Sequence, residues 1–204
     1  MACNSVALKT KNYQHVGEVL FSEEAIQQRV VELGNEITRD FSGRDLLVAG
    51  MLKGSVLFAC DLARKIDLPI RLDFISIAKF RKLGRPSGIS ILKDLDSDIG
   101  GRNILIVQDI IDTGFTTNYL LRNLRSRSPA TLAVCTLLDR RSIRIIDVPV
   151  AYRGFVVGED YVVGYGLDCG EEYRGLPFIA KLEREFQRWR SDGIRLGPSD
   201  NVTR

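Results

Sequence analysis

An apolar run that leads into acidic residues and a glycine turn constrains the fold of this chain most strongly. The run Asn103–Val107 has the composition of a buried strand, and it continues as Gln-Asp-Ile-Ile-Asp-Thr-Gly-Phe-Thr-Thr up to Thr117. Leucines then recur in Asn118–Leu124, as they do in a helix. A strand, a glycine turn and a helix N-terminus form a cradle whose backbone N–H groups bind phosphate. Two acids beside this cradle indicate a ligand that combines hydroxyls, a divalent metal and a phosphate, as a phosphorylated ribose does.

Strands and helices alternate along the rest of the chain. We expect helices over about 23–39 and about 56–66, and a third helix after Thr117. The expected strands cover about 45–50, 70–77, 88–92, 104–107, 131–138 and 161–165. This alternation predicts an α/β protein whose mainly parallel sheet is flanked by helices. Ligands of such sheets bind beyond the carboxyl ends of the strands, where Lys53–Gly54, Asp109–Thr117 and Asp139–Arg141 fall.

Composition narrows the possible functions. The 204 residues, 45% of them hydrophobic, suit a single domain over 1–204, with 1–15 and about 190–204 flexible. The absence of a long apolar run and of a secretory signal predicts a cytoplasmic protein without membrane contact. A net charge of +3 is too weak to indicate nucleic acid, and one histidine with four scattered cysteines argues against zinc. Lys181–Arg190 mixes both charges, which is typical of a solvated helix face; a subunit or RNA contact is the alternative.

Four stretches of the chain resemble one branch of the type I phosphoribosyltransferase family, the hypoxanthine-guanine phosphoribosyltransferases. They are Met51–Ser55, Val107–Thr117, Thr136–Arg140 and Tyr161–Asp168, with Tyr173–Arg174 following the last. The resemblance implies the type I phosphoribosyltransferase fold, with a small hood formed by the N- and C-terminal segments. It also implies purine salvage: transfer of the 5-phosphoribosyl group from phosphoribosyl diphosphate to hypoxanthine or guanine, giving IMP or GMP and diphosphate.

The resemblance also implies a role for each matching residue. Asp112 matches the proton acceptor at the purine ring. The phosphoribosyl group would contact Gln108, Asp109, Asp112, Thr113, Gly114, Phe115, Thr116 and Thr117. The diphosphate would contact Lys53, Gly54 and Arg174, and a cis peptide bond is expected between Leu52 and Lys53. The purine would contact Arg140, Tyr161, Val162 and Leu167. Mg²⁺ would be held by Asp168 and Asp109.

Simpler interpretations of two of these residues stay open. An Asp before Thr-Gly, as at Asp112, is also good turn and helix-cap chemistry. An aromatic residue in an apolar strand, as at Tyr161, is commonly part of the core. The four matching stretches together favour the functional interpretation of both residues.

Three positions depart from the family pattern. Gln108 replaces the first of two paired acids; it can still hydrogen-bond a ribose hydroxyl but supplies no charge. Arg140 replaces a lysine that donates to the purine's exocyclic oxygen. Lys79-Phe80 replaces a Ser-Tyr pair at the start of a mobile loop, Lys79–Ser87, that normally closes over the site. A regulatory or RNA-binding relative with little turnover, or a xanthine-preferring enzyme, is therefore the alternative. The resemblance also implies a homodimer or homotetramer.

Overall fold

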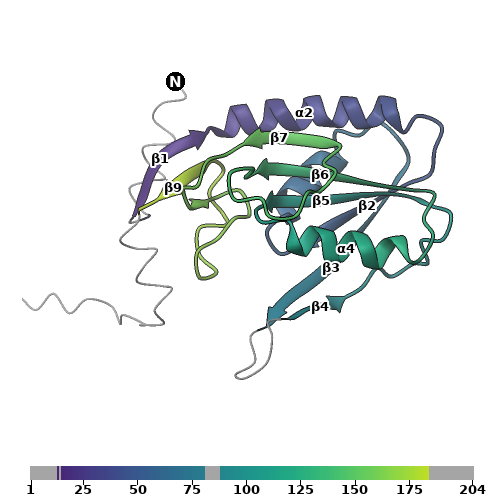
Figure 1. Ribbon diagram of the computed structural model, residues 1–204. Coiled ribbons are helices and arrows are strands. Elements are labelled where there is room, and N and C mark those ends of the chain that lie inside the picture. Colours follow the sequence, from purple (N-terminus) through teal and green to yellow (C-terminus); the bar gives the residue numbers. More distant parts are fainter. Residues whose placement is uncertain (1–12, 14, 81–87, 184–204) are drawn as a thin grey trace, which may run out of the picture.

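The computed structural model describes residues 13, 15–80 and 88–183, and a six-stranded sheet forms its centre (Figure 1). The strands lie in the order β4-β3-β2-β5-β6-β7. Only β4 runs antiparallel to its neighbour; the other adjacent strands are parallel. Their bounds are β2 Leu46–Leu52, β3 Ile70–Phe80, β4 Gly88–Lys93, β5 Asn103–Ile111, β6 Thr131–Asp139 and β7 Tyr152–Val156. The predicted α/β fold with a mainly parallel sheet is thus confirmed.

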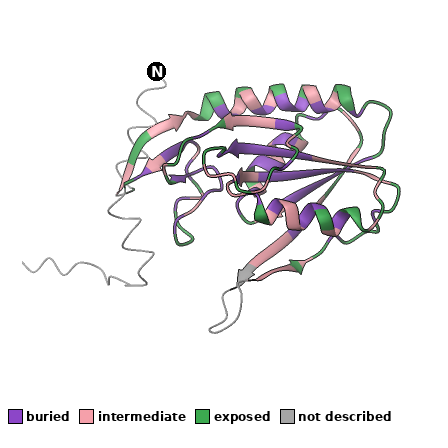
Figure 2. Ribbon diagram, viewed as in Figure 1, coloured by how far each residue is buried: buried purple, intermediate pink, exposed green. Residues whose placement is uncertain are grey.

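Helices cover both faces of this sheet. α2 (Glu23–Asp40) and α3 (Val56–Ala63) pack on one face, and α4 (Phe115–Arg125) packs on the other. Leu105 of β5 belongs to the apolar cluster of α2 and α3, whereas its neighbour Ile106 belongs to that of α4. The central strands are buried on both sides (Figure 2), which explains their unbroken apolar runs.

In the part of the chain that the structure describes, every helix is too short or too polar to cross a membrane.

α2 forms where the sequence predicts it. The Ser22 hydroxyl accepts a hydrogen bond from the Ala25 N–H at 3.2 Å and caps the helix N-terminus. The apolar residues at helical spacing are all fully buried: Ile26, Val30, Leu33 and Ile37. The helix ends one residue beyond the predicted boundary, at Asp40.

A smaller sheet forms the hood that the resemblance implies. β1 (Val16–Phe21) and β8 (Val162–Val163) both pair antiparallel with β9 (Ile179–Leu182). The N-terminal and C-terminal segments therefore lie side by side at one end of the molecule (Figure 1). β1, β7 and β9 are absent from the strands that the sequence predicts. Sequence reasoning missed them because each is short and none alternates clearly.

Two predicted elements are shorter in the structure. The strand expected over 161–165 is reduced to β8, because Gly164, Tyr165 and Gly166 have φ angles of 102°, 48° and 97°, which end extended structure. The helix expected over 56–66 ends at Ala63.

A predicted loop and a predicted helix are wrong at their first residues, which belong to strands in the structure. Lys79 and Phe80 do not begin a loop: they are the end of β3, and their backbones pair with Ile89 and Gly88 of β4. The remainder of the proposed closing loop, residues 81–87, lies outside the described residues. Lys181–Leu182 belong to β9 rather than to a helix, and residues 184–190 also lie outside the described residues.

Candidate active site

A pocket of about 340 Å³ opens where β5 ends and α4 begins. Seven of the eight residues predicted to bind the phosphoribosyl group line it: Gln108, Asp109, Asp112, Thr113, Gly114, Thr116 and Thr117. The eighth, Phe115, is the first residue of α4; it is 47% exposed and faces a neighbouring groove with Asn118 and Tyr119. The pocket lies at the carboxyl end of the sheet, as predicted for a ligand site in this architecture.

The N-terminus of α4 is suited to bind an anion. Its N-cap is Gly114, which has a left-handed φ of 88° and provides no side-chain cap. A Cβ at this position would overlap the carbonyl oxygen of Ile146, so the turn requires glycine. The Thr113 carbonyl accepts hydrogen bonds from the N–H groups of Ile145 and Ile146, at 3.0 Å each, which anchors the turn. The first-turn N–H groups thus face the pocket without a side-chain cap, as phosphate-binding helix ends do.

Asp112 forms an ion pair with Arg140. The Asp112 Oδ1 to Arg140 Nη1 distance is 3.0 Å, and the Arg140 side chain is only 10% exposed. The same guanidinium donates from Nε to the Gly158 carbonyl at 2.9 Å and from Nη2 to the Asp160 carbonyl at 2.8 Å. Arg140 therefore holds the Asp112 carboxylate in place. Sequence reasoning assigned Arg140 to the purine alone and missed this contact.

Arg144 anchors the backbone of the same loop, and no role was predicted for it. Its guanidinium donates to the Asp112 carbonyl at 2.7 Å and to the Ile111 carbonyl at 3.0 Å, and it pairs with the carboxylate of Asp139. Burial alone would raise the pKa of Asp139, but hydrogen bonds from Arg153, Arg141 and Arg144 lower it below its ordinary value. Asp139 at the end of β6 was a signal for this cluster, because a buried carboxylate requires such partners.

Gln108 is fully buried, and both ends of its amide have a partner inside the protein. Its Oε1 accepts a hydrogen bond from the Thr117 hydroxyl at 2.8 Å, and its Nε2 lies 3.4 Å from the sulfur of Met51. Gln108 lines the pocket, and the predicted hydrogen bond from its amide to a ribose hydroxyl stays a prediction. The amide ties β5 to the first turn of α4 and to the end of β2.

Restoring the acid of the family pattern is expected to destabilise the protein. In Gln108→Glu, a carboxylate would replace the amide at a fully buried position. We expect a loss of about 2–4 kcal/mol in unfolding free energy at pH 8, a smaller loss at pH 5 where the carboxyl group is protonated, and no gain in kcat. Urea unfolding at both pH values measures this. The matched control, Gln28→Glu at an exposed position of α2, should lose under about 1 kcal/mol. Higher activity with unchanged stability would contradict this interpretation.

Asp109 lies against the Lys53–Gly54 turn. A Cβ added at Gly54 would overlap Oδ2 of Asp109, so β5 approaches this turn as closely as glycine permits. Burial raises the pKa of Asp109 from 3.8 to about 6; hydrogen bonds from backbone N–H groups and the charge of Arg174 oppose this rise, and Asp112 adds to it. The pKa of Asp109 therefore depends on the charges of both Arg174 and Asp112.

The raised pKa predicts that Asp109 destabilises the free protein at alkaline pH. The folded state binds its proton more tightly, so this contribution is absent below about 3.8 and is complete above about 6. We expect Asp109→Asn to raise the unfolding free energy by up to about 3 kcal/mol at pH 8, and by much less at pH 4.5. Urea unfolding of the ligand-free protein measures both values. Asp147→Asn, at an exposed position, should give no gain at either pH; an equal gain for Asp109→Asn at both values would contradict the titration.

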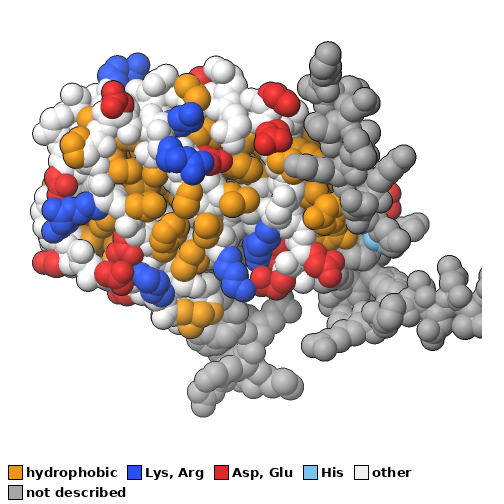
Figure 3. All heavy atoms as spheres, turned by 180° about the vertical axis from the view of Figure 1, so that it is seen from behind, with side chains coloured by type: hydrophobic (Ala, Val, Ile, Leu, Met, Phe, Trp, Pro, Cys, Tyr) orange, Lys and Arg blue, Asp and Glu red, His pale blue; other side chains and the backbone are white. Residues whose placement is uncertain are grey.

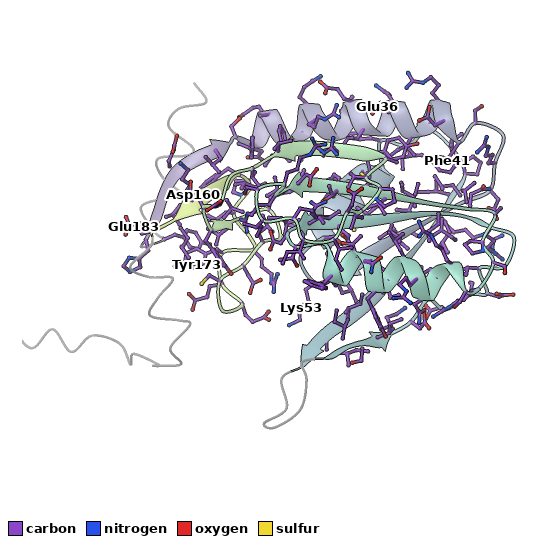
Figure 4. The ribbon with its side chains drawn as sticks, in the orientation of Figure 1. Glu36, Phe41, Lys53, Asp160, Tyr173 and Glu183 are labelled. Atoms are coloured by element: carbon purple, nitrogen blue, oxygen red, sulfur yellow. The ribbon has the colours of Figure 1, made fainter. Side chains whose placement is uncertain are left out.

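The residues predicted to bind diphosphate gather around one acidic side chain. Lys53 follows β2, and the peptide bond Leu52–Lys53 is cis, as the resemblance implies. In Figure 4, Lys53 lies at the end of the sheet that faces the loop carrying Tyr173. Its Nζ is 3.1 Å from Oε2 of Glu171, and Nη2 of Arg174 is 3.2 Å from the same oxygen. Sequence reasoning missed Glu171, although an acid between Asp168 and Arg174 was a visible signal.

The residues predicted to contact the purine lie beside this cluster. Tyr161 is 41% exposed and donates from its hydroxyl to the Asp168 carbonyl at 2.9 Å. Burial raises the pKa of Tyr161, and the charges of nearby Asp168 and Asp112 raise it further. Val162 and Leu167 are buried.

The two predicted metal ligands do not form a complete metal site. Among the residues that the structure describes, no group of three or more His, Cys, Asp and Glu side chains could hold a metal. Oδ1 of Asp168 is 2.9 Å from Nη2 of Arg174, and its Oδ2 accepts the Glu171 N–H at 2.8 Å. Any metal here would require oxygen ligands from a substrate or from water.

Comparisons with known proteins identify the family of this chain. Residues 18–169 match the family described as "Phosphoribosyl transferase domain". The hypoxanthine-guanine phosphoribosyltransferase of Mycobacterium avium is 46% identical over 85% of this chain and 89% of its own length. The hypoxanthine phosphoribosyltransferase of Escherichia coli is 41% identical over 83% of this chain and 97% of its own. A hypoxanthine phosphoribosyltransferase structure from Staphylococcus aureus is 38% identical, covers 86% of this chain and 96% of its own, and superimposes with a TM-score of 0.82. This chain therefore belongs to the phosphoribosyltransferase family.

Proposed function

We propose that this protein is a purine-salvage enzyme that transfers the 5-phosphoribosyl group from phosphoribosyl diphosphate to hypoxanthine or guanine, giving IMP or GMP. The relatives with 41–46% identity that carry these activities in their names support this assignment. The observation that carries it is the pocket in which Asp112 lies beside the N-terminus of α4, which no side chain caps. A carboxylate and an anion cradle in one pocket match a pair of substrates, one with a phosphate and the other with an acidic ring proton.

The reaction divides the pocket between anion binding and proton transfer. The first-turn N–H groups of α4 bind the 5-phosphate, with Thr113 and Thr116 beside them, and Asp109 binds the ribose hydroxyls. Lys53 and Arg174 bind the diphosphate, which leaves as the bond from C1′ to its oxygen breaks. A new bond forms between C1′ and the purine ring nitrogen, whose proton passes to Asp112.

Mg²⁺ fits the acidic residues present, with the substrate completing its coordination. Asp168 and Asp109 are the residues that would hold it, because Mg²⁺ is commonly bound by one or two carboxylates together with phosphate oxygens and water. The bound ion would neutralise charge on the departing diphosphate. Arg174 contacts Asp168 in the free protein, so the proposed diphosphate ligand and the proposed metal ligand lie side by side.

Arg140 has two roles in this proposal. Three of its five guanidinium N–H groups are used by Asp112, Gly158 and Asp160, and two remain for the exocyclic oxygen of the base. Tyr161 stacks on the purine ring, and the backbone near Val162 and Leu167 contacts its edge. One guanidinium can therefore contact the 6-oxo group and the proton acceptor Asp112 at the same time. A lysine has a single ammonium group and is less suited to hold both.

Self-association is also proposed, through the face of the sheet that carries α3. Large hydrophobic side chains are exposed there at Leu57 of α3 and Leu72 of β3. Leu92 of β4 is 71% exposed and points to the same face, because its neighbour Ile91 packs with the cluster of α4. Figure 3 shows hydrophobic side chains gathered across this face. An exposed apolar surface of this kind favours a homodimer or homotetramer.

Initial rates with four bases test the assignment. The protein is incubated with Mg²⁺, phosphoribosyl diphosphate and hypoxanthine, guanine, xanthine or adenine, and the nucleotide formed is measured. We expect product from hypoxanthine or guanine and none from adenine, because adenine has no 6-oxo group to accept from Arg140. Turnover of xanthine alone would indicate a xanthine-preferring enzyme and would overturn the proposed base.

A further inference from the structure

Glu171 occupies the position between the two cations that are proposed to bind diphosphate. A single oxygen of its carboxylate, Oε2, lies 3.1 Å from Nζ of Lys53 and 3.2 Å from Nη2 of Arg174. Lys53 and Glu171 are 118 residues apart in the sequence, so the fold and not local chain geometry brings them together. Two cations that meet at one anionic oxygen form the arrangement that a phosphate oxygen would also bind.

The backbone of Glu171 has an unusual conformation and is held by Asp168. Its φ angle is 72°, in the left-handed region that residues other than glycine rarely adopt. Its N–H donates to Oδ2 of Asp168 at 2.8 Å, while Oδ1 of Asp168 is 2.9 Å from Nη2 of Arg174. These contacts connect the charged side chains of the loop from Asp168 to Arg174 with one another. With Lys53, the connected residues are a proposed metal ligand, two proposed diphosphate ligands and Glu171.

The contact of Glu171 with Lys53 is exposed, whereas Arg174, whose side chain is 26% exposed, contacts Glu171 from a partly buried position. The side chains of Lys53 and Glu171 are 68% and 64% exposed, so water and salt screen their attraction. Exposed ion pairs of this kind stabilise a fold little, so a purely structural role does not account for the arrangement.

We propose that Glu171 is an internal competitor of diphosphate, holding Lys53 and Arg174 until the substrate displaces it and returning to them as diphosphate leaves. This inference rests on the proposed function, because it assigns diphosphate to these two cations. A competing side chain reduces the apparent affinity for diphosphate by the fraction of molecules in which the site is open. The same two cations bind the diphosphate group of the substrate and the diphosphate product. A lower affinity for diphosphate lets the product leave more readily and so limits product inhibition.

Diphosphate binding to Glu171→Gln tests this inference. Isothermal titration of inorganic diphosphate in Mg²⁺ is carried out on the wild type, on Glu171→Gln and on the control Glu172→Gln. The control removes the same charge from the next residue of the same loop but leaves both ion pairs of Glu171 intact. We expect Glu171→Gln to bind diphosphate about threefold to tenfold more tightly, and the control to stay within about twofold of the wild type. The inhibition constant of diphosphate in the forward reaction should fall by the same factor.

Each outcome decides between distinct conclusions. Equal affinity of the wild type and Glu171→Gln for diphosphate would overturn the inference while leaving the diphosphate site in place. Equal tightening in Glu172→Gln would also overturn it, because the effect would then be general charge repulsion. If none of the three proteins binds diphosphate, the site at Lys53 and Arg174 is wrong, and the proposed function fails together with the inference.

Discussion

Asp112→Asn is expected to lower kcat by about 10²–10⁴, the usual contribution of a general base, while phosphoribosyl diphosphate still binds. An asparagine retains the size of the side chain, and its amide oxygen can still accept from Nη1 of Arg140. It cannot take the proton of the purine ring nitrogen at neutral pH. The loss should therefore appear in kcat, with the Kd of phosphoribosyl diphosphate changed by less than about threefold.

The control for this variant is Asp147→Asn. Asp147 is exposed and does not line the pocket, so its rate should equal that of the wild type. Stopped-flow single-turnover rates, measured across pH, separate chemistry from product release. A wild-type rate in Asp112→Asn would remove Asp112 from its proposed role and would leave it as a residue of the turn held by Arg140.

Gly54→Ala is expected to reduce kcat/KM by at least about 10² and the unfolding free energy by about 1–3 kcal/mol. Gly54 is enclosed from two directions: a Cβ there would overlap Oδ2 of Asp109, and its own carbonyl oxygen lies where a Cβ of Gly166 would be. The added methyl group must move Asp109 or the Lys53 turn. Either displacement separates the proposed ribose and diphosphate contacts.

Gly175→Ala is the matched control for this substitution. A Cβ at Gly175 would meet no atom within 4 Å, although the residue follows Arg174 directly. Its steady-state rates and urea unfolding curve should be close to those of the wild type. Normal activity in Gly54→Ala would contradict the close approach of β5 to the turn after β2.

The parts of the fold that the sequence predicts are those governed by local patterns. The spacing of Ile26 to Ile37 gives α2, and the apolar run before Gln108 gives β5, because each burial pattern is complete within one element. β1 and β9 are different. They pair across more than 150 residues of sequence, and neither has a pattern of its own that marks it as a strand.

In the candidate site, too, local features could be predicted from the sequence, whereas contacts between distant segments could not. Most of the contiguous loop from Asp109 to Thr117 lies along one pocket, with Phe115 outside it, because neighbours in sequence remain neighbours in space. The contacts of Arg140 with Asp112 and of Glu171 with Lys53 depend on how separate loops meet at the end of the sheet. Gln108 is a further example. Its residue type shows that the side chain can form hydrogen bonds, but only the packing shows that its Oε1 accepts from Thr117.

The stoichiometry of one reaction tests the central claim most directly. The protein is mixed with Mg²⁺, phosphoribosyl diphosphate and hypoxanthine, and IMP and diphosphate are quantified together over time. We expect one IMP and one diphosphate for each phosphoribosyl diphosphate consumed, and neither product in the absence of a base. Binding of phosphoribosyl diphosphate without IMP from hypoxanthine or GMP from guanine would contradict it, and would indicate a regulatory relative that retains the pocket without the reaction.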